Sequence, residues 1–364
     1  MRKSILIAIS ILCAPTSLSH AAEFPLFDIE ARKAALQTED YKEIKEMCMA
    51  KGASYPEDGL EPVIALKPTK AYGTDRGMNN FAWAMMLDGG RALAGDLEAK
   101  KRAAALLLSW AKVGALYESK VHHDPYYAIK RGMIPVIVTY AIIKDEYSFA
   151  HQNLVEAWID KLVRKIDHKF GGDVDHNNHR YLADSLLMLW GAYKDDKTLY
   201  QKGIERFEIA LKDMEDDGAL PLEDRRGNRA LWYIRQSIAD LTLMAEVAKY
   251  KNDDLYNKEI EGRSLALLVN HFIHGVYNQD ILLERASENY IPGPSDYFLQ
   301  QDMGFLDDRG RRHYLGVGEL YRISAEDEFS KKRFDMLMKQ HVDDERPLID
   351  DYIGGNATCF WAEP

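Results

Sequence analysis

Apolar residues recur at intervals of three and four positions along most of this chain, which is the spacing of amphipathic helices. Phe81, Met85, Met86 and Leu93 would share one helical face, and the run from Ala104 to Ala115 predicts a second helix. Further helices are predicted at residues 126–144, 148–169, 179–193, 197–213, 228–250, 264–274, 311–322 and 328–341. No stretch alternates as a sheet would require, so we predict an all-α protein.

Short turns rich in Gly and Asp separate these segments, as at residues 171–173 and 215–218. Helices joined in sequential pairs favour a ring of antiparallel helical hairpins whose loops gather at a central cleft. Residues 290–308 contain two prolines and two glycines and are expected to form an irregular wall of that cleft.

The chain has 364 residues, of which 46% are hydrophobic, enough for the core of one large domain. Residues 1–21 have the pattern of a signal peptide, with a basic start, an apolar centre from Ile5 to Cys13 and a small-residue cleavage site at 19–21. We therefore expect a single domain over residues 22–364. No later segment has the ~18 apolar residues of a membrane helix, so we expect an exported chain, periplasmic or secreted, with no membrane partner.

Charge narrows the choice of ligand. Removal of residues 1–21 takes away Arg2 and Lys3 but no acidic residue, so the net charge goes from −11 to −13. Nucleic acid binding requires a basic face, which this composition does not predict. An anionic ligand would have to be attracted by basic groups gathered locally in a cleft.

Two cysteines, Cys48 and Cys359, remain after the signal peptide. In an oxidising compartment they could form a disulfide between the two ends of the domain. Two buried, unpaired thiols are the alternative.

The first polar cluster is residues 173–181, at the start of a predicted helix. Asn178 and His179 lie where free backbone N–H groups and the helix dipole favour an anion. They could bind a carboxylate and move a proton beside it. The alternative is that Asn177 or Asn178 only caps the helix and that His179 is a packed core residue.

The second polar cluster begins at Arg225 and Arg226 and continues into the helix predicted at 228–250. On a period of 3.6 residues Arg229, Tyr233, Gln236 and Asp240 share one face. This polar stripe would face either a cleft or solvent. A third candidate region, residues 65–77, carries Lys67, Lys70, Tyr72 and Arg76 and could be a lid over an anionic chain or an ordinary solvated loop.

These motifs resemble those of the alginate lyases of polysaccharide lyase family 5. Residues 177–181 resemble the family's Asn-Asn-His-Ser-Tyr-Trp motif, and residues 229–233 its Arg-Ala-Leu-x-Tyr segment. Residues 216–223, 109–116 and 70–76 resemble three further family segments. The matches keep the family order from about residue 70 to 250, with weaker traces to about 321.

The resemblance implies an incomplete (α/α) toroid with a long cleft, and β-elimination of a 4-linked, mannuronate-type uronic acid polymer without a metal or other cofactor. It implies that Asn178 and Arg229 neutralise the sugar carboxylate, that His179 assists or performs proton abstraction, and that Tyr72 lies on a lid. Tyr181 and the basic residues named above would bind the anionic polysaccharide. We expect a monomer.

One position departs from the family. The catalytic tyrosine lies seven residues after the arginine, and that position here is Gln236. Glutamine exchanges hydrogen bonds but is neither an acid nor a base near neutral pH. Tyr233, one helical turn away, is the first candidate to replace it, and Tyr72 and Tyr181 are the others.

Three other hypotheses remain open. One is a uronan-binding relative that has lost catalysis. Another is a glycoside hydrolase on the same toroid that uses Glu223, Asp224, Asp173 or Asp175. The third is a metal site at His176 and His179 or at His271 and His274, although no third ligand is evident from spacing.

Overall fold

A computed structural model describes residues 24–68, 76–290, 297–307 and 311–364. The predicted signal peptide and the lid residues Lys70 and Tyr72 lie outside these ranges. Within them no helix is both long and apolar enough to cross a membrane.

Fifteen α-helices are described over these ranges: α1 (Ile29–Ala35), α2 (Lys42–Cys48), α3 (Arg76–Leu93), α4 (Leu97–Lys112), α5 (His123–Ile143), α6 (Phe149–Ile166), α7 (Asn178–Lys194), α8 (Lys197–Asp213), α9 (Pro221–Asp224), α10 (Ala230–Tyr250), α11 (Leu265–Tyr277), α12 (Leu283–Ser287), α13 (Val317–Ser324), α14 (Glu328–His341) and α15 (Ala357–Trp361). Short 3₁₀ turns are η1 (Lys144–Glu146), η2 (Gly172–Asp175), η3 (Gly227–Arg229), η4 (Gln279–Leu282), η5 (Asp343–Glu345) and η6 (Asp351–Ile353). The strands described are β1 (Ile349–Asp350) and β2 (Gly355–Asn356), which pair antiparallel. The prediction of an all-α protein is confirmed.

Aspartate side chains cap the second helix in two of the helical hairpins. The side chain of Asp96 accepts hydrogen bonds from the N–H groups of Glu98 and Ala99 at the start of α4. Asp196 does the same at the start of α8. A carboxylate in this position satisfies N–H groups that have no partner within the helix. Because the connections before α4 and α8 are so short, each helix turns back against the one before it.

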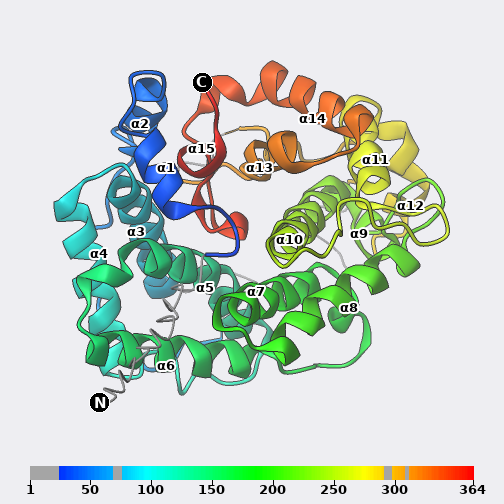
Figure 1. Cartoon of the computed structure of the whole chain (residues 1–364). Helices are drawn as coiled ribbons and strands as arrows, with labels where there is room; N and C mark the ends of the chain where they lie inside the picture. Colours follow the sequence, from blue (N-terminus) through cyan, green and yellow to red (C-terminus); the bar gives the residue numbers. More distant parts are fainter. Residues whose placement is uncertain (1–23, 69–75, 291–296, 308–310) are drawn as a thin grey trace, which may run out of the picture.

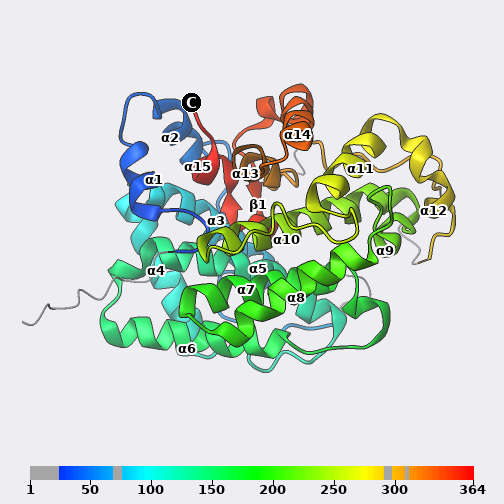
Figure 2. The same cartoon turned by 45° about the vertical axis from the view of Figure 1, so that its right-hand side comes forward.

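The helices follow one another around a ring, and the colour sequence in Figure 1 passes from blue at the upper left through green to red beside the blue again. The last helix, α15, therefore lies next to α1 and α2, and Figure 2 shows the same arrangement. A disulfide between Cys48 and Cys359 joins α2 to α15, with the two Cα atoms 4.8 Å apart. Of the two alternatives for these cysteines, the structure has the disulfide.

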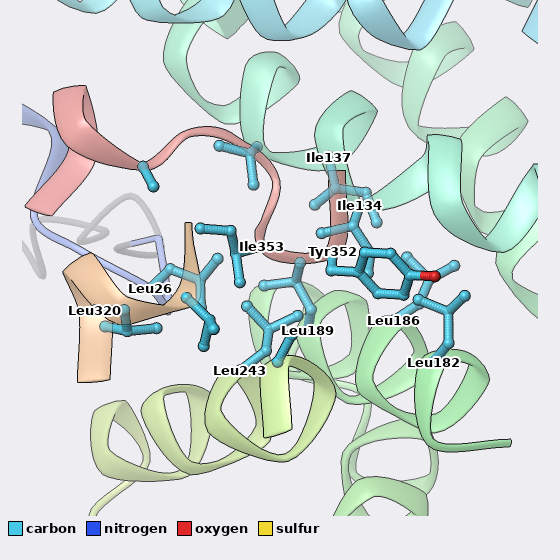
Figure 3. Close-up of a cluster of buried hydrophobic side chains, with 14 of the residues drawn as sticks. Leu26, Ile134, Ile137, Leu182, Leu186, Leu189, Leu243, Leu320, Tyr352 and Ile353 are labelled. Carbon is cyan, nitrogen blue, oxygen red and sulfur yellow. The ribbon is translucent and has the colours of Figure 1, made fainter. Parts of the chain in front are cut away.

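The core contains a segment that the sequence pattern did not reveal. Residues 349–356, comprising β1, η6 and β2, enter the ring, and Figure 3 shows Tyr352 and Ile353 packed among Ile134 and Ile137 of α5 and leucines of α7 and α10. Gly354 turns this segment with φ +95°, and a Cβ there would lie 2.4 Å from the Val138 Cγ2 atom. Only glycine fits such a turn against a helix.

Helix bounds mostly agree with the predictions, and α8 and α14 begin and end where expected. The prediction for 311–322 is wrong at its start, because α13 begins only at Val317. The residues before it instead contact the inserted segment, where the His313 N–H donates to the Ile349 carbonyl at 3.0 Å. Residues 297–307, the described centre of the expected irregular wall, contain no helix.

Candidate active site

A cavity of about 310 Å³ lies where α5, α7, α10 and the inserted segment meet. Its lining is predominantly polar and aromatic, and it consists of Tyr127, Arg131, Asn178, His179, Arg229, Trp232, Tyr233, Gln236, Tyr314 and Tyr352. The five residues predicted to be catalytic, Asn178, His179, Arg229, Tyr233 and Gln236, all line it. Their convergence is thus observed, whereas their chemical roles stay predictions.

The start of α7 presents Asn178 to this cavity. The preceding residue, Asn177, is the cap, and its side chain accepts a hydrogen bond from the His179 N–H at 3.0 Å. Asn178 is therefore not needed as a cap. Its Nδ2 donates to Oε1 of Gln236 at 2.6 Å, and no described residue donates to its Oδ1.

Glu223 supports Asn178 from behind. Its Oε1 accepts hydrogen bonds from the Asn178 N–H at 2.8 Å and from the Ser237 hydroxyl at 3.2 Å. Burial raises the pKa of Glu223 to about 8. Burial thus favours the neutral carboxyl group over the carboxylate behind Asn178.

His179 is held by α5 on two sides. The Lys130 ammonium group donates to the His179 carbonyl at 3.1 Å, and burial lowers the pKa of Lys130 to about 8. The ring of Tyr127 meets the imidazole edge to face, with centroids 5.2 Å apart. The first contact holds the main chain of His179, and the second positions its imidazole at the cavity wall.

Arg229, the last residue of η3 directly before α10, carries the cationic group on this side of the cavity. Arg229 is 35% exposed in its side chain, and its Nη2 lies 3.5 Å from Oδ2 of Asp302. A contact this long leaves the guanidinium able to bind another carboxylate. The ring of Tyr233 is covered by the guanidinium of Arg226, 3.6 Å from its centroid.

Five lining residues were missed by sequence reasoning: Tyr127, Arg131, Trp232, Tyr314 and Tyr352. The Arg131 guanidinium donates from Nη2 to both oxygens of Asp351, at 3.0 and 2.8 Å. Asp351 also pairs with Arg312 at 2.9 Å. Burial by itself raises the pKa of Asp351, but the two guanidinium groups outweigh burial and lower it. A single arginine inside the apolar helix at 126–144, one turn after a tyrosine, was the available signal.

Several residues predicted to bind substrate lie elsewhere. Asp240 does not face the cavity: it is fully buried, and burial raises its pKa well above the ordinary value. Tyr181 is also buried and lines a separate hollow with Leu220 and Glu223. The prediction that these two residues face the cleft is wrong.

The predicted basic residues are also dispersed. Arg225 pairs with Glu288 at 2.6 Å, and Arg226 is buried over Tyr233, so neither lines the cavity. Lys67 is exposed and is not among the residues that line the cavity. Arg76 begins α3, but its side chain lies outside the described part of the structure.

The carboxylates proposed for a hydrolase do not line the cavity either. Glu223 and Asp224 are fully buried, and Asp224 is bonded to the His271 Nε2 at 2.8 Å. His176 lies 3.9 Å from Asp213. Over the described ranges, no three His, Cys, Asp or Glu side chains are grouped so that they could hold a metal ion.

Comparison with known proteins agrees with this geometry. A profile described as "Alginate lyase" matches residues 35–282. The chain is 30% identical to a polysaccharide lyase of Stenotrophomonas maltophilia over 166 residues, 44% of this chain and 50% of the relative. It is 26% identical to an alginate lyase of Cobetia marina over 264 residues, 69% of this chain and 63% of the relative. The chain thus spans about half the length of the first curated relatives that it matches.

Among solved structures, alginate lyase A1-III from Sphingomonas species A1 superposes with a TM-score of 0.72 at 21% identity, covering 96% of this chain and 99% of that one. Variants of A1-III with a histidine changed to alanine, or a tyrosine to phenylalanine, match as complexes with a tetrasaccharide, also with TM-scores of 0.72. The ring of helices is therefore the (α/α) toroid of these enzymes, as predicted. Because the profile covers more than half of the sequence, the chain belongs to the alginate lyase family.

Proposed function

We propose that this protein is a polysaccharide lyase that cleaves a 4-linked uronic acid polymer, mannuronate-rich alginate or a related polyuronate, by β-elimination. The observation that carries the proposal is the convergence of an amide, an imidazole and a guanidinium, those of Asn178, His179 and Arg229, on one cavity. The family membership of the chain and the tetrasaccharide bound by A1-III variants point in the same direction.

The chemistry requires the carboxylate to be neutralised first. The proton on C5 of a uronate is weakly acidic because the adjacent carboxylate resists a second negative charge. Donors from Asn178, Gln236 and Arg229 would bind this carboxylate and stabilise the charge that develops on it. The Gln236 side-chain oxygen is bonded to Asn178, so its amide N–H groups are the part available to substrate.

Proton abstraction would fall to His179. A neutral imidazole accepts a proton near physiological pH, and this one is fixed beside Asn178 at the start of α7. Tyr233, the other catalytic candidate from α10, would contact substrate at the mouth of the cavity. Export through residues 1–21 and action as a monomer on an anionic polysaccharide are part of the same proposal.

The test is the appearance of the unsaturated uronate absorbance with polymannuronate, polyguluronate and polyglucuronate. Wild-type protein should form this product from at least one polymer. His179→Ala should lower the rate by ~10²-fold or more, the usual contribution of a general base. His274→Ala, which changes an exposed histidine on α11, is the matched control and should keep the wild-type rate.

Gln236 favours a second candidate, a uronan-binding protein without catalysis, because no acid or base replaces the family tyrosine at that position. Polymer binding without any unsaturated product would support this candidate instead. New reducing ends without unsaturation would indicate hydrolysis and contradict both.

A further inference from the structure

With Gln236 at the position of the family tyrosine, one step of the lyase reaction lacks a proton donor. When the C4–O4 bond breaks, the departing oxygen needs a proton, and a glutamine amide cannot give one near neutral pH. Gln236 is moreover committed to Asn178 through the 2.6 Å hydrogen bond. Another group at the cavity must therefore be the acid.

Two tyrosines that the sequence motifs do not include form one wall of the cavity. Tyr127 comes from α5 and Tyr352 from η6, and their hydroxyl oxygens are 2.7 Å apart. Tyr127 also contacts the imidazole of His179, the proposed base, with ring centroids 5.2 Å apart. Tyr127 is 8% exposed and Tyr352 only 1%, so Tyr127 is the more accessible of the two.

On the basis of the lyase function proposed above, we propose that Tyr127 is the general acid that protonates the leaving O4, and that Tyr352 is a positioning residue that holds the Tyr127 hydroxyl. His179 takes the C5 proton, and the electron pair of that C–H bond forms the C4–C5 double bond. The C4–O4 bond breaks with its electron pair on O4, which takes the phenolic proton of Tyr127. The tyrosinate then regains a proton from the neighbouring imidazolium of His179, so both residues return to their starting states.

The charges around Tyr127 favour its role as a proton donor. Burial raises the pKa of Tyr127, although the Arg131 cation opposes this effect, so the phenol carries its proton at neutral pH. Burial likewise raises the pKa of Tyr352. The Arg131 guanidinium lies 5.4 Å from the Tyr127 ring centroid and 5.2 Å from that of Tyr352. It stands where it would stabilise the negative charge that Tyr127 acquires as it donates.

Tyr233 is the competing residue. It lies on α10, across from α5, and its ring face is covered by Arg226 at 3.6 Å. The ring of Tyr127, by contrast, contacts the imidazole of His179. Tyr233→Phe therefore belongs in the same experiment.

The experiment compares the variants Tyr127→Phe, Tyr352→Phe and Tyr233→Phe on two substrates. The first is the polyuronate that the wild type cleaves fastest. The second is a synthetic uronide with fluoride or nitrophenolate at C4, a leaving group that departs without protonation by an acid. Tyr127→Phe should lower kcat on the polymer by ~10²- to 10⁴-fold, the range for general acid catalysis. On the activated uronide its loss should be less than ~10-fold, whereas His179→Ala stays impaired on both substrates because the C5 proton must still be removed.

Tyr352→Phe should show the same dependence on the leaving group with a smaller loss in kcat and an unchanged KM, because its hydroxyl acts through Tyr127. Tyr140→Phe is the matched control. It removes another buried hydroxyl of α5, one that donates to Glu156 at 2.8 Å outside the cavity, and should keep the wild-type rate on both substrates.

Each outcome decides between the two proposals. If wild-type protein forms no unsaturated product from any polyuronate, the lyase function fails and the assignment of Tyr127 with it. If wild-type protein is active and Tyr127→Phe matches Tyr140→Phe, or Tyr233→Phe alone shows the leaving-group dependence, the assignment is wrong and the lyase function stands. Equal losses of kcat on both substrates in Tyr127→Phe would also overturn the assignment of Tyr127. If Tyr127→Phe does not fold, the same comparison in Tyr352→Phe decides the case.

Discussion

Glu223 couples the stability of the fold to pH at the scale of a single residue. Burial raises its pKa to about 8 in the folded protein, compared with about 4.3 for an exposed glutamate. Between these two values the folded chain keeps a proton that the unfolded chain has lost. Rising pH therefore favours the unfolded state over this window, by up to about 1.4 kcal/mol per pH unit.

Glu223→Gln should remove this dependence. A glutamine oxygen can accept the same hydrogen bonds from Asn178 and Ser237, and the amide does not titrate. We expect the thermal midpoint of the variant to be close to that of the wild type at pH 5 and clearly above it at pH 8.5. Thermal unfolding of both proteins across this range measures the effect.

Glu328→Gln, in the exposed first turn of α14, is the control, and its difference from wild type should be nearly constant with pH. A constant difference for Glu223→Gln as well would mean that Glu223 is already ionised in the fold at pH 5.

The predicted residues that line the cavity lie close together in sequence motifs, and the lining residues that were missed do not. Asn178, His179 and Arg229 belong to short polar clusters at helix starts. Tyr352 reaches the same cavity from 174 positions beyond Asn178, and only tertiary packing brings it there. Asp240 was misplaced for a different reason. It shares a helical face with Arg229 but lies 11 residues on, about 16 Å deeper along α10, where the face is covered.

At the scale of elements, the inserted segment 349–356 links helices of the ring to one another beside the cavity. Asp351 of η6 holds Arg131 of α5 and Arg312 at once. Asp350 faces Arg235 of α10 at 3.7 Å, and burial raises its pKa. The segment therefore attaches α5 and α10 to each other through buried charges, in addition to the apolar contacts in Figure 3.

Asp351→Asn should destabilise the fold by removing one of these buried charges. The asparagine keeps the shape of the side chain but leaves the buried Arg312 and the largely buried Arg131 without this anion. Breaking a buried pair in this way costs about 3 kcal/mol or more. We expect the urea midpoint to fall accordingly with little change in the m-value. The KM for polymer should rise, because Arg131 is no longer held at the cavity.

Asp145→Asn provides the comparison. It removes an aspartate that is 62% exposed in its side chain where it pairs with Lys100, and pairs at the surface contribute less than about 1 kcal/mol. Equal effects of the two substitutions would show that Asp351 does not secure the inserted segment.

Elements with regular periodicity were predictable, and this segment was not. Helices α8 and α14 have long amphipathic repeats and clear aspartate caps, so local physics determines their bounds. The strands β1 and β2 have two residues each, too few to leave a period. The position of β2 in the core depends on contacts with α3, and that of η6 on contacts with α5 and α10, all of them distant in sequence.

At the scale of the whole molecule, an acidic chain with net charge −11 presents arginines at its cavity. Arg131 and Arg229 both line it, and they pair with Asp351 and Asp302 respectively. The attraction for an anionic sugar is thus local, since the overall charge repels a polyanion at long range. The ring of helices concentrates cationic groups from distant segments in one place.

The disulfide between Cys48 and Cys359 spans 311 residues and joins the first and last parts of the ring. In the chain-entropy model, closing so long a loop in the unfolded state stabilises the fold by ~5 kcal/mol. Replacing both cysteines by alanine should lower the urea midpoint, and a reductant should lower that of the wild type but not that of the variant. Because none of the cavity residues comes from α2 or α15, the folded variant should keep most of its lyase activity well below its midpoint. A midpoint unchanged by the double substitution would mean that the helix contacts alone hold the ring closed.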